Sequence, residues 1–371
     1  MKWYSLKKIL AKHCKYNIIF GLRSNGKSYA VLEYALQKFL KTGKTLGLIR
    51  RYREDFRGKR GQAMFANLEC NGNGENIISK LTKGKYSKII YNASRWYLAY
   101  WDNDLQKYVH EDEPFCYAFA LSEMEHDKST SFPTIGTILF DEFITRAAYL
   151  PDEFILFMNC LSTIIRHRND VEIFMCANTV SGAKYNPYFK EMGLKHVSKM
   201  QPGDINVYEY GQSDLKVAVE FSDSPTKNRP SDVYFAFDNP KLAMITGQGD
   251  VWELDIYPHI THKIDKNDIC YSYFIKFEEH LLQADIVIND HEKFTFIHLK
   301  TTPIKNDYND IVFCLTPDER YNYYVNLLRP TNDISKKIIS FFLANKVFYQ
   351  SNDIGEVVNQ YLNNCRKALL K

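Results

Sequence analysis

The segment from Gly21 to Ser28 has the residue types and spacing of a phosphate-binding loop. It reads Gly-Leu-Arg-Ser-Asn-Gly-Lys-Ser, which fits the pattern Gly-x-x-x-x-Gly-Lys-Ser/Thr. In this pattern the backbone N–H groups of a glycine-rich turn and the amino end of the next helix face phosphate oxygens. Lys27 would reach the β and γ phosphates, and Ser28 would ligate Mg²⁺. We therefore expect a nucleoside triphosphate to bind at Gly21, Ser24, Asn25, Gly26, Lys27 and Ser28.

Two adjacent acids, Asp141 and Glu142, follow the apolar run from Ile135 to Phe140. A strand that ends in Asp-Glu can place the first carboxylate in the shell of Mg²⁺ and the second where it polarises an attacking water. We expect Asp141 to hold the metal and Glu142 to act on the water. The alternative is a strand that ends in two solvated acids.

Two further polar residues lie at the ends of expected elements. Asn178 follows the strand expected at 171–177, and its side chain could hydrogen-bond the γ-phosphate or the water; the alternative is a turn residue. Arg166 follows the helix expected at 152–165. It could spread charge off the transferring phosphoryl group as an arginine finger, which a neighbouring subunit often supplies. The alternative is a solvated helix end.

Alternating strands and helices must position these residues. A strand at 16–20 precedes the loop, and a helix is expected from 26 to 42 because apolar residues recur there at helical spacing. Further strands are expected at 45–49, 115–121, 135–140 and 171–177, with an aromatic hairpin at 89–101. This alternation predicts an α/β domain around a mostly parallel sheet.

The chain after residue 200 has a different texture. Polar and glycine-containing stretches predict a linker, and consecutive strands from about 270, followed by helical stretches, predict a second α/β domain. The expected division is therefore a P-loop domain at 1–205, a linker region at 206–257 and a carboxy-terminal domain at 258–371.

Length and composition narrow the class of protein. The 371 residues include 48 Lys and Arg against 44 Asp and Glu, a net charge of +4, and 15% of them are aromatic. This composition excludes disordered, collagenous and coiled-coil proteins. Eight scattered cysteines without a CxxC pair favour reduced thiols in a cytoplasm. No apolar run approaches the ~18 residues of a membrane span, so we expect a soluble protein without a membrane partner.

Five groups of residues, taken together, resemble one known family. They are Gly21 with Gly26-Lys27-Ser28-Tyr29-Ala30, Ile49-Arg50-Arg51-Tyr52, the run from Thr137 to Ile144, Arg166-His167-Arg168, and Asn186-Pro187-Tyr188-Phe189. Their order and approximate spacing are similar to those of the genome-packaging ATPases of phi-twenty-nine-like bacteriophages. The resemblance extends over about 16–190 and, more weakly, from 270 to the end.

The resemblance implies a fold, an activity and partners. The fold would be a P-loop ATPase domain of the ASCE type with a mostly parallel sheet, plus a carboxy-terminal RNase H-like α/β domain. The activity would be ATP hydrolysis with Mg²⁺ that drives double-stranded DNA into a preformed capsid. The protein would form a homopentameric ring in the host cytoplasm, attached transiently to the capsid portal (connector) protein, with a structural RNA in some relatives.

The resemblance also assigns roles to single residues. Arg23 corresponds to an arginine that senses or binds phosphate. Arg166 corresponds to the finger that acts across a subunit boundary, and Lys128 to a lysine that also reaches the neighbour's site. The positions that match the family's nucleotide-binding and catalytic residues are Lys27, Ser28, Asp141 and Glu142.

A run of basic residues could contact DNA. The segment 50–60 contains six basic and two acidic residues and begins where an expected strand ends. Each phosphate contact would steepen the salt dependence of DNA binding by about one unit. The alternatives are contact with a neighbouring subunit and a solvated basic loop. Arg146 is a second candidate, expected to face the pore of the ring. The candidates are Arg50, Arg51, Arg53, Arg57, Lys59, Arg60 and Arg146.

Related large terminases carry a nuclease in the carboxy-terminal domain, where a cluster of carboxylates holds two metals. Here the expected strand from Tyr271 to Phe277 has no aspartate at its centre, and Glu278, Glu279 and Asp285 fall at expected strand ends. We therefore expect no nuclease activity. Two alternatives to the motor stay open: a large terminase with an active metal-dependent nuclease, and a nucleotide-gated assembly scaffold with negligible turnover.

Overall fold

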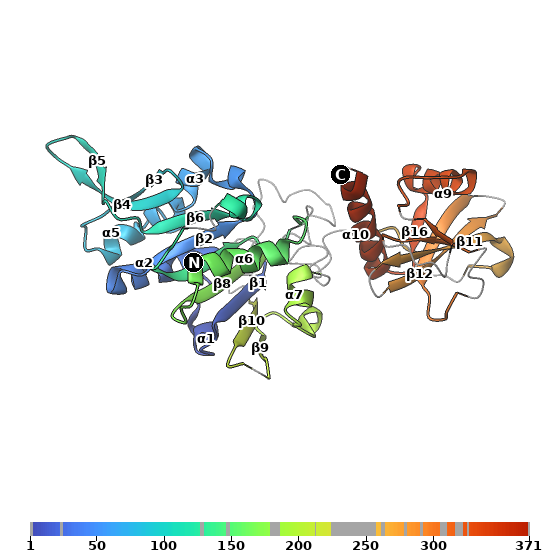
Figure 1. The fold of residues 1–371 in the computed structure, drawn as a ribbon, viewed down its shortest axis with the longest axis horizontal. Coiled ribbons are helices and arrows are strands. Elements are labelled where there is room, and N and C mark those ends of the chain that lie inside the picture. Colours follow the sequence, from blue (N-terminus) through green and yellow to red (C-terminus); the bar gives the residue numbers. More distant parts are fainter. Residues whose placement is uncertain are drawn as a thin grey trace. The chain divides into compact units, whose positions relative to one another are not determined.

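The structure of the protein, a computed structural model, contains two compact units, Met1–Trp252 and Glu253–Lys371. It describes residues 3–22, 25–126, 130–145, 149–178, 186–211, 213–223, 257–260, 264–277, 280–289, 292–304, 310–315, 322–324 and 326–369. Each unit has its own sheet (Figure 1).

The first unit is built around a sheet with the strand order β3-β4-β6-β2-β7-β8-β1-β10-β9, with β5 paired to β4. Its central strands are parallel: β1 (Tyr16–Gly21), β2 (Thr45–Arg50), β7 (Ile135–Asp141), β8 (Glu172–Asn178) and β10 (Lys216–Ser222). Parallel strands end at the same edge of a sheet. This carboxyl edge therefore carries Gly21, Arg50, Asp141, Asn178 and Ser222.

Shorter elements complete the first unit. Strands β3 and β4 pair antiparallel, which confirms the hairpin expected at 89–101. The elements are α1 (Lys7–Leu10), η1 (Arg53–Phe56), α3 (Lys59–Ala63), α4 (Ala66–Glu69), α5 (Ile77–Leu81), β3 (Lys88–Asn92), β4 (Arg95–Asp102), β5 (Lys107–His110), β6 (Cys116–Ala120), η2 (Leu121–His126), α7 (Pro187–Glu191), η4 (Val197–Lys199) and β9 (Ile205–Glu209).

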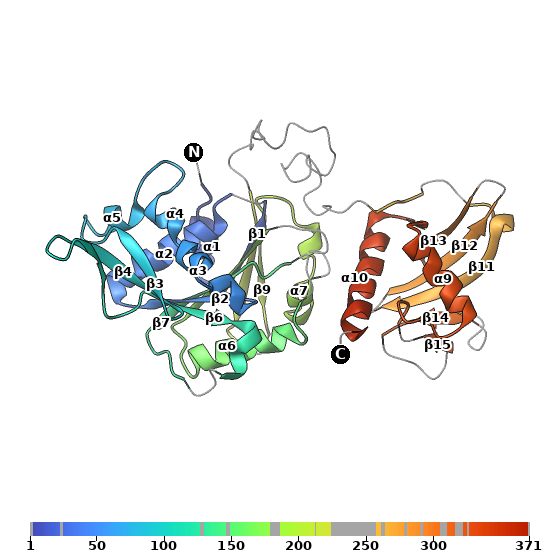
Figure 2. The ribbon, with the colours of Figure 1, turned by 90° about the horizontal axis from the view of Figure 1, so that it is seen from above.

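Helices cover both faces of this sheet (Figure 2). Helix α2 (Lys27–Thr42) packs in the same core cluster as Ile19 of β1, whereas α6 (Glu153–Ile165) packs in the cluster of Ile18 and Phe20. Because successive residues of a strand face opposite sides, the two helices lie on opposite faces of β1. The first unit is a mixed α/β structure, and the two helices predicted from the sequence are confirmed.

Part of the expected linker belongs to the first sheet. Strand β10 pairs with β1 along its whole length, and β9 pairs with β10. Val217, Ala218 and Val219 are fully buried. The prediction that the linker begins at 206 is therefore wrong, because a short inner strand between polar turns is hard to tell from a loop in the sequence. Residues 224–256 lie outside the described residues.

The second unit contains a sheet with the order β15-β14-β11-β12-β13-β16. Strand β12 pairs antiparallel with both β11 and β13. The other pairings are parallel: β14 with β11, β15 with β14, and β16 with β13. Helix α10 packs Tyr361 against Phe277 of β11, with ring centroids 5.9 Å apart. The bounds are η5 (Lys266–Asp268), β11 (Ile269–Phe277), β12 (His280–Ile288), β13 (Lys293–Leu299), β14 (Ile311–Phe313), β15 (Asn322–Tyr324), α9 (Asp333–Leu343), β16 (Val347–Tyr349) and α10 (Asn352–Leu369).

Consecutive strands followed by helical stretches were predicted for this part of the chain. The structure confirms the strands before α9 and the helices α9 and α10, but β16 lies between these two helices and was not predicted. Within the described ranges, no helix has the length and apolar character that crossing a membrane requires.

Candidate nucleotide site

Lys27 lies at the carboxyl edge of the sheet, in the first turn of α2. Its Nζ donates to the backbone oxygens of Gly21 (3.2 Å) and Leu22 (2.6 Å) and to Oδ1 of Asn25 (3.1 Å) and Asn178 (3.3 Å). The residue is 4% exposed, and burial is the main cause that lowers its pKa to about 8. An anionic ligand would offset the cost of burying this charge, so the site suits a phosphate group.

The turn before α2 depends on Gly26, whose φ of +93° lies in the left-handed region. A side chain there would be strained and would meet the ring of Trp3 at 3.3 Å. The helix begins directly after this turn, so its free N–H groups and positive dipole end face the same place as Lys27.

Ser28 and Asp141 are in direct contact, since Ser28 Oγ donates to Asp141 Oδ1 over 2.6 Å. Both groups are oxygen ligands of the kind that Mg²⁺ prefers. Among the described residues, no group of three or more His, Cys, Asp or Glu could hold a metal ion. An ion at Ser28 and Asp141 would therefore complete its shell with triphosphate oxygens and water, and the residues present fit Mg²⁺ in that role.

Arg50, at the end of β2, contacts both acids of the predicted pair. Its NH2 lies 2.6 Å from Asp141 Oδ2 and its NH1 2.6 Å from Glu142 Oε2. Glu142 has a φ of +59°, in the left-handed region that residues with a side chain rarely adopt. The Arg50 side chain is only 14% exposed.

Arg50 was expected to contact DNA, and the structure corrects this because its guanidinium is engaged at the nucleotide edge. The sequence indicated Arg50 as a DNA contact and not as a partner of Asp141 and Glu142. The available signal was its place at the end of a strand, but only the strand order shows that β2 lies beside β7.

Arg51 belongs to a buried network. Its Nε and NH2 each lie 2.7 Å from the carboxylate of Glu153, and NH2 also donates to the backbone oxygen of Phe143 over 2.9 Å. Tyr188 donates to the same carboxylate over 2.8 Å. Arg51 is 6% and Glu153 3% exposed. The prediction that Arg51 contacts DNA is therefore wrong, and its role is to fix the chain after Glu142 against α6.

The other basic candidates differ in what the structure shows. Arg53 pairs with Glu123 over 2.8 Å. Three basic side chains on α3 and just before it are exposed: Arg57, Lys59 and Arg60. The expected site residues that lie outside the described residues are Arg23, Ser24, Lys128 and Arg146.

Arg166 lies far from the acids of its own chain. Its NH2 donates to the backbone oxygen of Thr130, and the nearby Arg168 donates to that of Ile135, the first residue of β7. Asp141 is the last residue of β7, and six steps along a strand amount to about 20 Å. Arg166 is thus near the opposite edge of the sheet and could complete a nucleotide site only in another chain.

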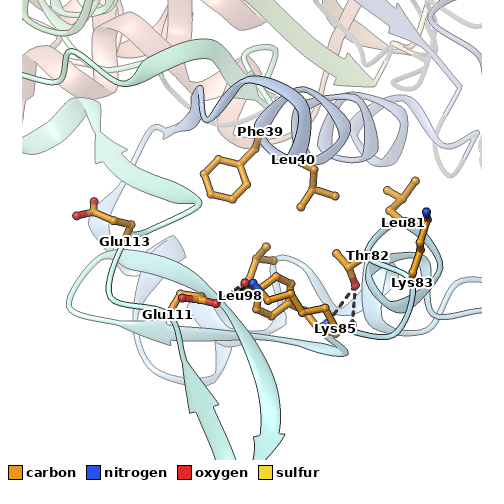
Figure 3. Close-up of a pocket in the computed structure, with 10 residues that line it drawn as sticks. Phe39, Leu40, Leu81, Thr82, Lys83, Lys85, Leu98, Glu111 and Glu113 are labelled. Carbon is orange, nitrogen blue, oxygen red and sulfur yellow. Dashed lines mark hydrogen bonds and ion pairs between the residues drawn. The ribbon is translucent and has the colours of Figure 1, made fainter.

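A pocket of about 500 Å³ lies at the other end of α2 (Figure 3). Phe39 and Leu40 of α2, Leu81 of α5 and Leu98 of β4 line it. The helix rise places Phe39 about 18 Å from Lys27. The pocket is therefore separate from the nucleotide edge.

The second unit carries a polar cluster around Asp285. Its carboxylate accepts hydrogen bonds from Ser272 Oγ (2.6 Å) and Gln283 Nε2 (2.8 Å) and lies 3.0 Å from His298 Nε2. Burial raises the pKa of Asp285, but these hydrogen bonds outweigh burial and lower it. Asp285 lies inside β12 and not at a strand end as expected, because β12 begins at His280. Glu278 and Glu279 lie outside the described residues.

Comparison with known proteins identifies the chain's relatives. The family model of the Podovirus DNA encapsidation protein (Gp16) matches residues 1–96 and 103–282. The DNA packaging proteins of Bacillus phages phi29 and B103 are 27% and 26% identical to the chain over 231 and 224 residues, which are 61% and 57% of this chain. The chain spans 60% and 58% of the length of these two relatives.

Solved structures show the same fold. A chain of the bacteriophage Phi-29 viral genome packaging motor assembly is 21% identical, with a TM-score of 0.55 and coverage of 99% of this chain and 98% of that chain. A chain of the Phi-28 gp11 DNA packaging motor is 18% identical, with a TM-score of 0.51 and coverage of 98% of both chains. The resemblance found in the sequence is confirmed by the family match. The chain belongs to the Podovirus DNA encapsidation protein (Gp16) family.

Proposed function

We propose that this protein is the ATPase of a viral DNA-packaging motor, which couples hydrolysis of ATP to movement of double-stranded DNA into a preformed capsid. The observation that carries the proposal is the meeting of Lys27, Ser28, Asp141 and Glu142 at one sheet edge. Phosphoryl transfer needs a buried cation, metal ligands and a group that orients water in this arrangement. The curated relatives are DNA packaging proteins.

Each residue at this edge has a distinct task in the proposed reaction. Lys27 binds the β and γ phosphates, and Ser28 and Asp141 hold Mg²⁺, which neutralises charge on the phosphate oxygens. Glu142 accepts a hydrogen bond from the attacking water and orients it. Arg50 bridges the two carboxylates, offsets their mutual repulsion and fixes their direction. Asn178, beside Lys27, is placed to contact the γ-phosphate.

The position of Arg166 favours a ring. Because Arg166 lies at the edge opposite Asp141, a catalytic role requires a neighbour that presents it head to tail, and such contacts form a ring when the rotation between subunits closes. We propose a homopentamer, with Lys128 as a second residue acting on the neighbour's site. Its partners would be double-stranded DNA, the capsid portal protein and, as in some relatives, a structural RNA, with the motor on the capsid in the host cytoplasm.

We further propose that the second unit is a vestigial RNase H-like domain. Three antiparallel strands followed by two parallel ones, in the order β13-β12-β11-β14-β15, support this fold. The carboxylate of Asp285 is already engaged by Ser272, Gln283 and His298, which favours a structural role over metal binding.

The test is ATP turnover with and without double-stranded DNA, repeated with Glu142→Gln. Turnover that DNA stimulates, and that Glu142→Gln reduces by about 10²-fold or more while ATP still binds, would support the motor. Glu113→Gln, an exposed acid at the rim of the distant pocket, is the matched control and should retain wild-type turnover. A slow rate that Glu142→Gln leaves unchanged would support the assembly scaffold. Metal-dependent nicking of plasmid DNA that Asp285→Asn abolishes would support the terminase.

A further inference from the structure

Ser222, the last residue of β10, contacts the phosphate loop. Its Oγ accepts a hydrogen bond from Asn25 Nδ2 over 2.8 Å and donates to the backbone oxygen of Phe20 over 3.0 Å. Ser222 is 1% and Asn25 4% exposed. No motif in the sequence marks Ser222, which lies in the segment that was expected to be a linker.

The chemistry of Lys27 fixes the direction of these hydrogen bonds. An ammonium group has donors only, so Asn25 must present its oxygen to Lys27 Nζ, 3.1 Å away. The NH₂ group of Asn25 then points the other way and needs a buried acceptor, which Ser222 Oγ provides. The Ser222 hydrogen in turn goes to Phe20. Every donor in this series, from Lys27 through Asn25 and Ser222 to the backbone oxygen of Phe20, has an acceptor only when the hydrogen bonds run in this direction. Hydrogen bonds in such a series polarise and strengthen one another.

The position of Ser222 also matches the first glycine of the loop. A Cβ atom on Gly21 would lie 2.2 Å from Ser222 Oγ, far inside van der Waals contact. No larger residue fits at Gly21 while Ser222 keeps its place. The hydroxyl group of Ser222 therefore has two separate effects: it excludes a side chain at Gly21, and it accepts a hydrogen bond from the Asn25 amide.

We propose that Ser222 is a positioning residue of the ATP site, whose hydroxyl orients the Asn25 amide and thereby holds the Lys27 ammonium where the triphosphate binds. The inference rests on the proposed function and extends the site to β10. Without the hydroxyl, the NH₂ group of Asn25 has no acceptor in a buried place, and a buried donor without a partner is costly. The amide then turns, and Lys27 loses one of its four oxygen partners, while those of Gly21, Leu22 and Asn178 remain.

The experiment measures ATP binding and steady-state turnover of the full-length chain carrying Ser222→Ala. We expect the Kd and KM for ATP to rise about tenfold, the cost of one unsatisfied buried donor, with a smaller change in kcat. Ser222→Thr retains the hydroxyl and should restore binding to within about twofold of wild type. Should Ser222→Ala fail to fold, Ser222→Cys, with a weaker donor and acceptor, should give an intermediate loss of affinity.

The matched control is Thr45→Val. Thr45 is 5% exposed and lies at the amino end of β2, where its hydroxyl donates a hydrogen bond to that of Thr134 over 3.2 Å. The variant therefore removes a buried hydroxyl at the edge of the sheet opposite the nucleotide site, and it should bind ATP like wild type. Equal affinity of Ser222→Ala and wild type would overturn the inference, as would equal losses in Ser222→Ala and Thr45→Val. The proposed function itself would be overturned if the wild-type chain bound no ATP, or if Lys27→Ala left its ATP affinity and turnover unchanged.

Discussion

Arg50 and Arg51 are neighbours in the chain but serve different parts of the molecule. Arg50 holds the acids at the nucleotide edge, whereas Arg51 is buried against Glu153 of α6. Buried charge pairs add little net stability when they are intact, but removal of one partner leaves an unpaired charge in the interior. The two arginines should therefore give different phenotypes when they are replaced.

We predict that Arg51→Ala lowers the free energy of unfolding of the first unit by about 3–5 kcal/mol, because Glu153 then stays buried without its cation. Urea unfolding of the full-length chain measures the change. Arg53→Ala, which breaks the exposed pair with Glu123, is the control and should cost less than about 1 kcal/mol. A similar small loss for Arg51→Ala would show that Glu153 is accommodated without Arg51.

At the scale of elements, the sequence predicted those that carry a strong local pattern. Strand β1, the loop and helix α2 form one contiguous motif, and the Asp-Glu pair begins at the end of a buried, mostly apolar strand. The same local patterns do not predict the strand order, so they offered no reason to expect Arg50, at the end of β2, beside Asp141, at the end of β7. Strand β10 was missed because Glu220 interrupts its apolar run. The carboxylate of Glu220 accepts a hydrogen bond from the hydroxyl of Tyr4, which is 216 residues away in the chain and could not be found from a local pattern.

The exposed basic segment beside η1 gives an element-scale prediction. If Arg57, Lys59 and Arg60 contact DNA phosphates, replacing all three by alanine should reduce the slope of log K against log salt by about 2.7, without changing sequence preference. DNA binding at several salt concentrations measures the slope. A triple replacement of exposed lysines near α5, Lys80, Lys83 and Lys85, is the control. A wild-type slope in the first variant would identify a solvated basic loop.

Strands β12 and β13 give a prediction about pH. A hydrogen bond to Asp285 raises the pKa of His298 above its ordinary 6.5, so this contribution to stability is full below 6.5 and is lost as pH rises through the raised value. The lowered pKa of Asp285 contributes above 3.8 and is lost only in acid. The second unit should therefore be less stable at about pH 8.5 than at about pH 6.

The measurement is the unfolding free energy of β12 and β13 in the full-length chain, from amide hydrogen exchange corrected for intrinsic rates. His298→Gln is the matched variant, since its amide can donate to Asp285 but does not titrate over this range. We expect its stability to be flat where that of wild type declines. An equal decline in both proteins would assign the pH dependence to other groups.

At the scale of the whole molecule, the resemblance predicted the family, and the direction of β7 supports the proposal that a neighbouring chain supplies Arg166. Arg166 and Asp141 lie near opposite edges of one sheet, a relation that is fixed by the direction of β7 and cannot change without unfolding the strand. The neighbouring Arg168 donates to the backbone oxygens of Phe132, Ile135 and Ile164. Arg168 is therefore held by several backbone oxygens, whereas Arg166 NH2 donates to that of Thr130, so Arg166 is the better candidate for the proposed action on a neighbour.

This division predicts complementation between two inactive proteins. Arg166→Ala should lose turnover but keep wild-type stability and ATP binding, whereas Lys27→Ala should lose ATP binding. In rings formed from an equal mixture, about a quarter of the sites combine an intact Lys27 with an intact Arg166 from the neighbour, so part of the DNA-stimulated ATPase activity should return. Arg168→Ala should instead lower the melting temperature, because several backbone oxygens lose their donor. Complete inactivity of the Arg166 and Lys27 mixture at every ratio, with rings present by light scattering, would contradict action across the boundary.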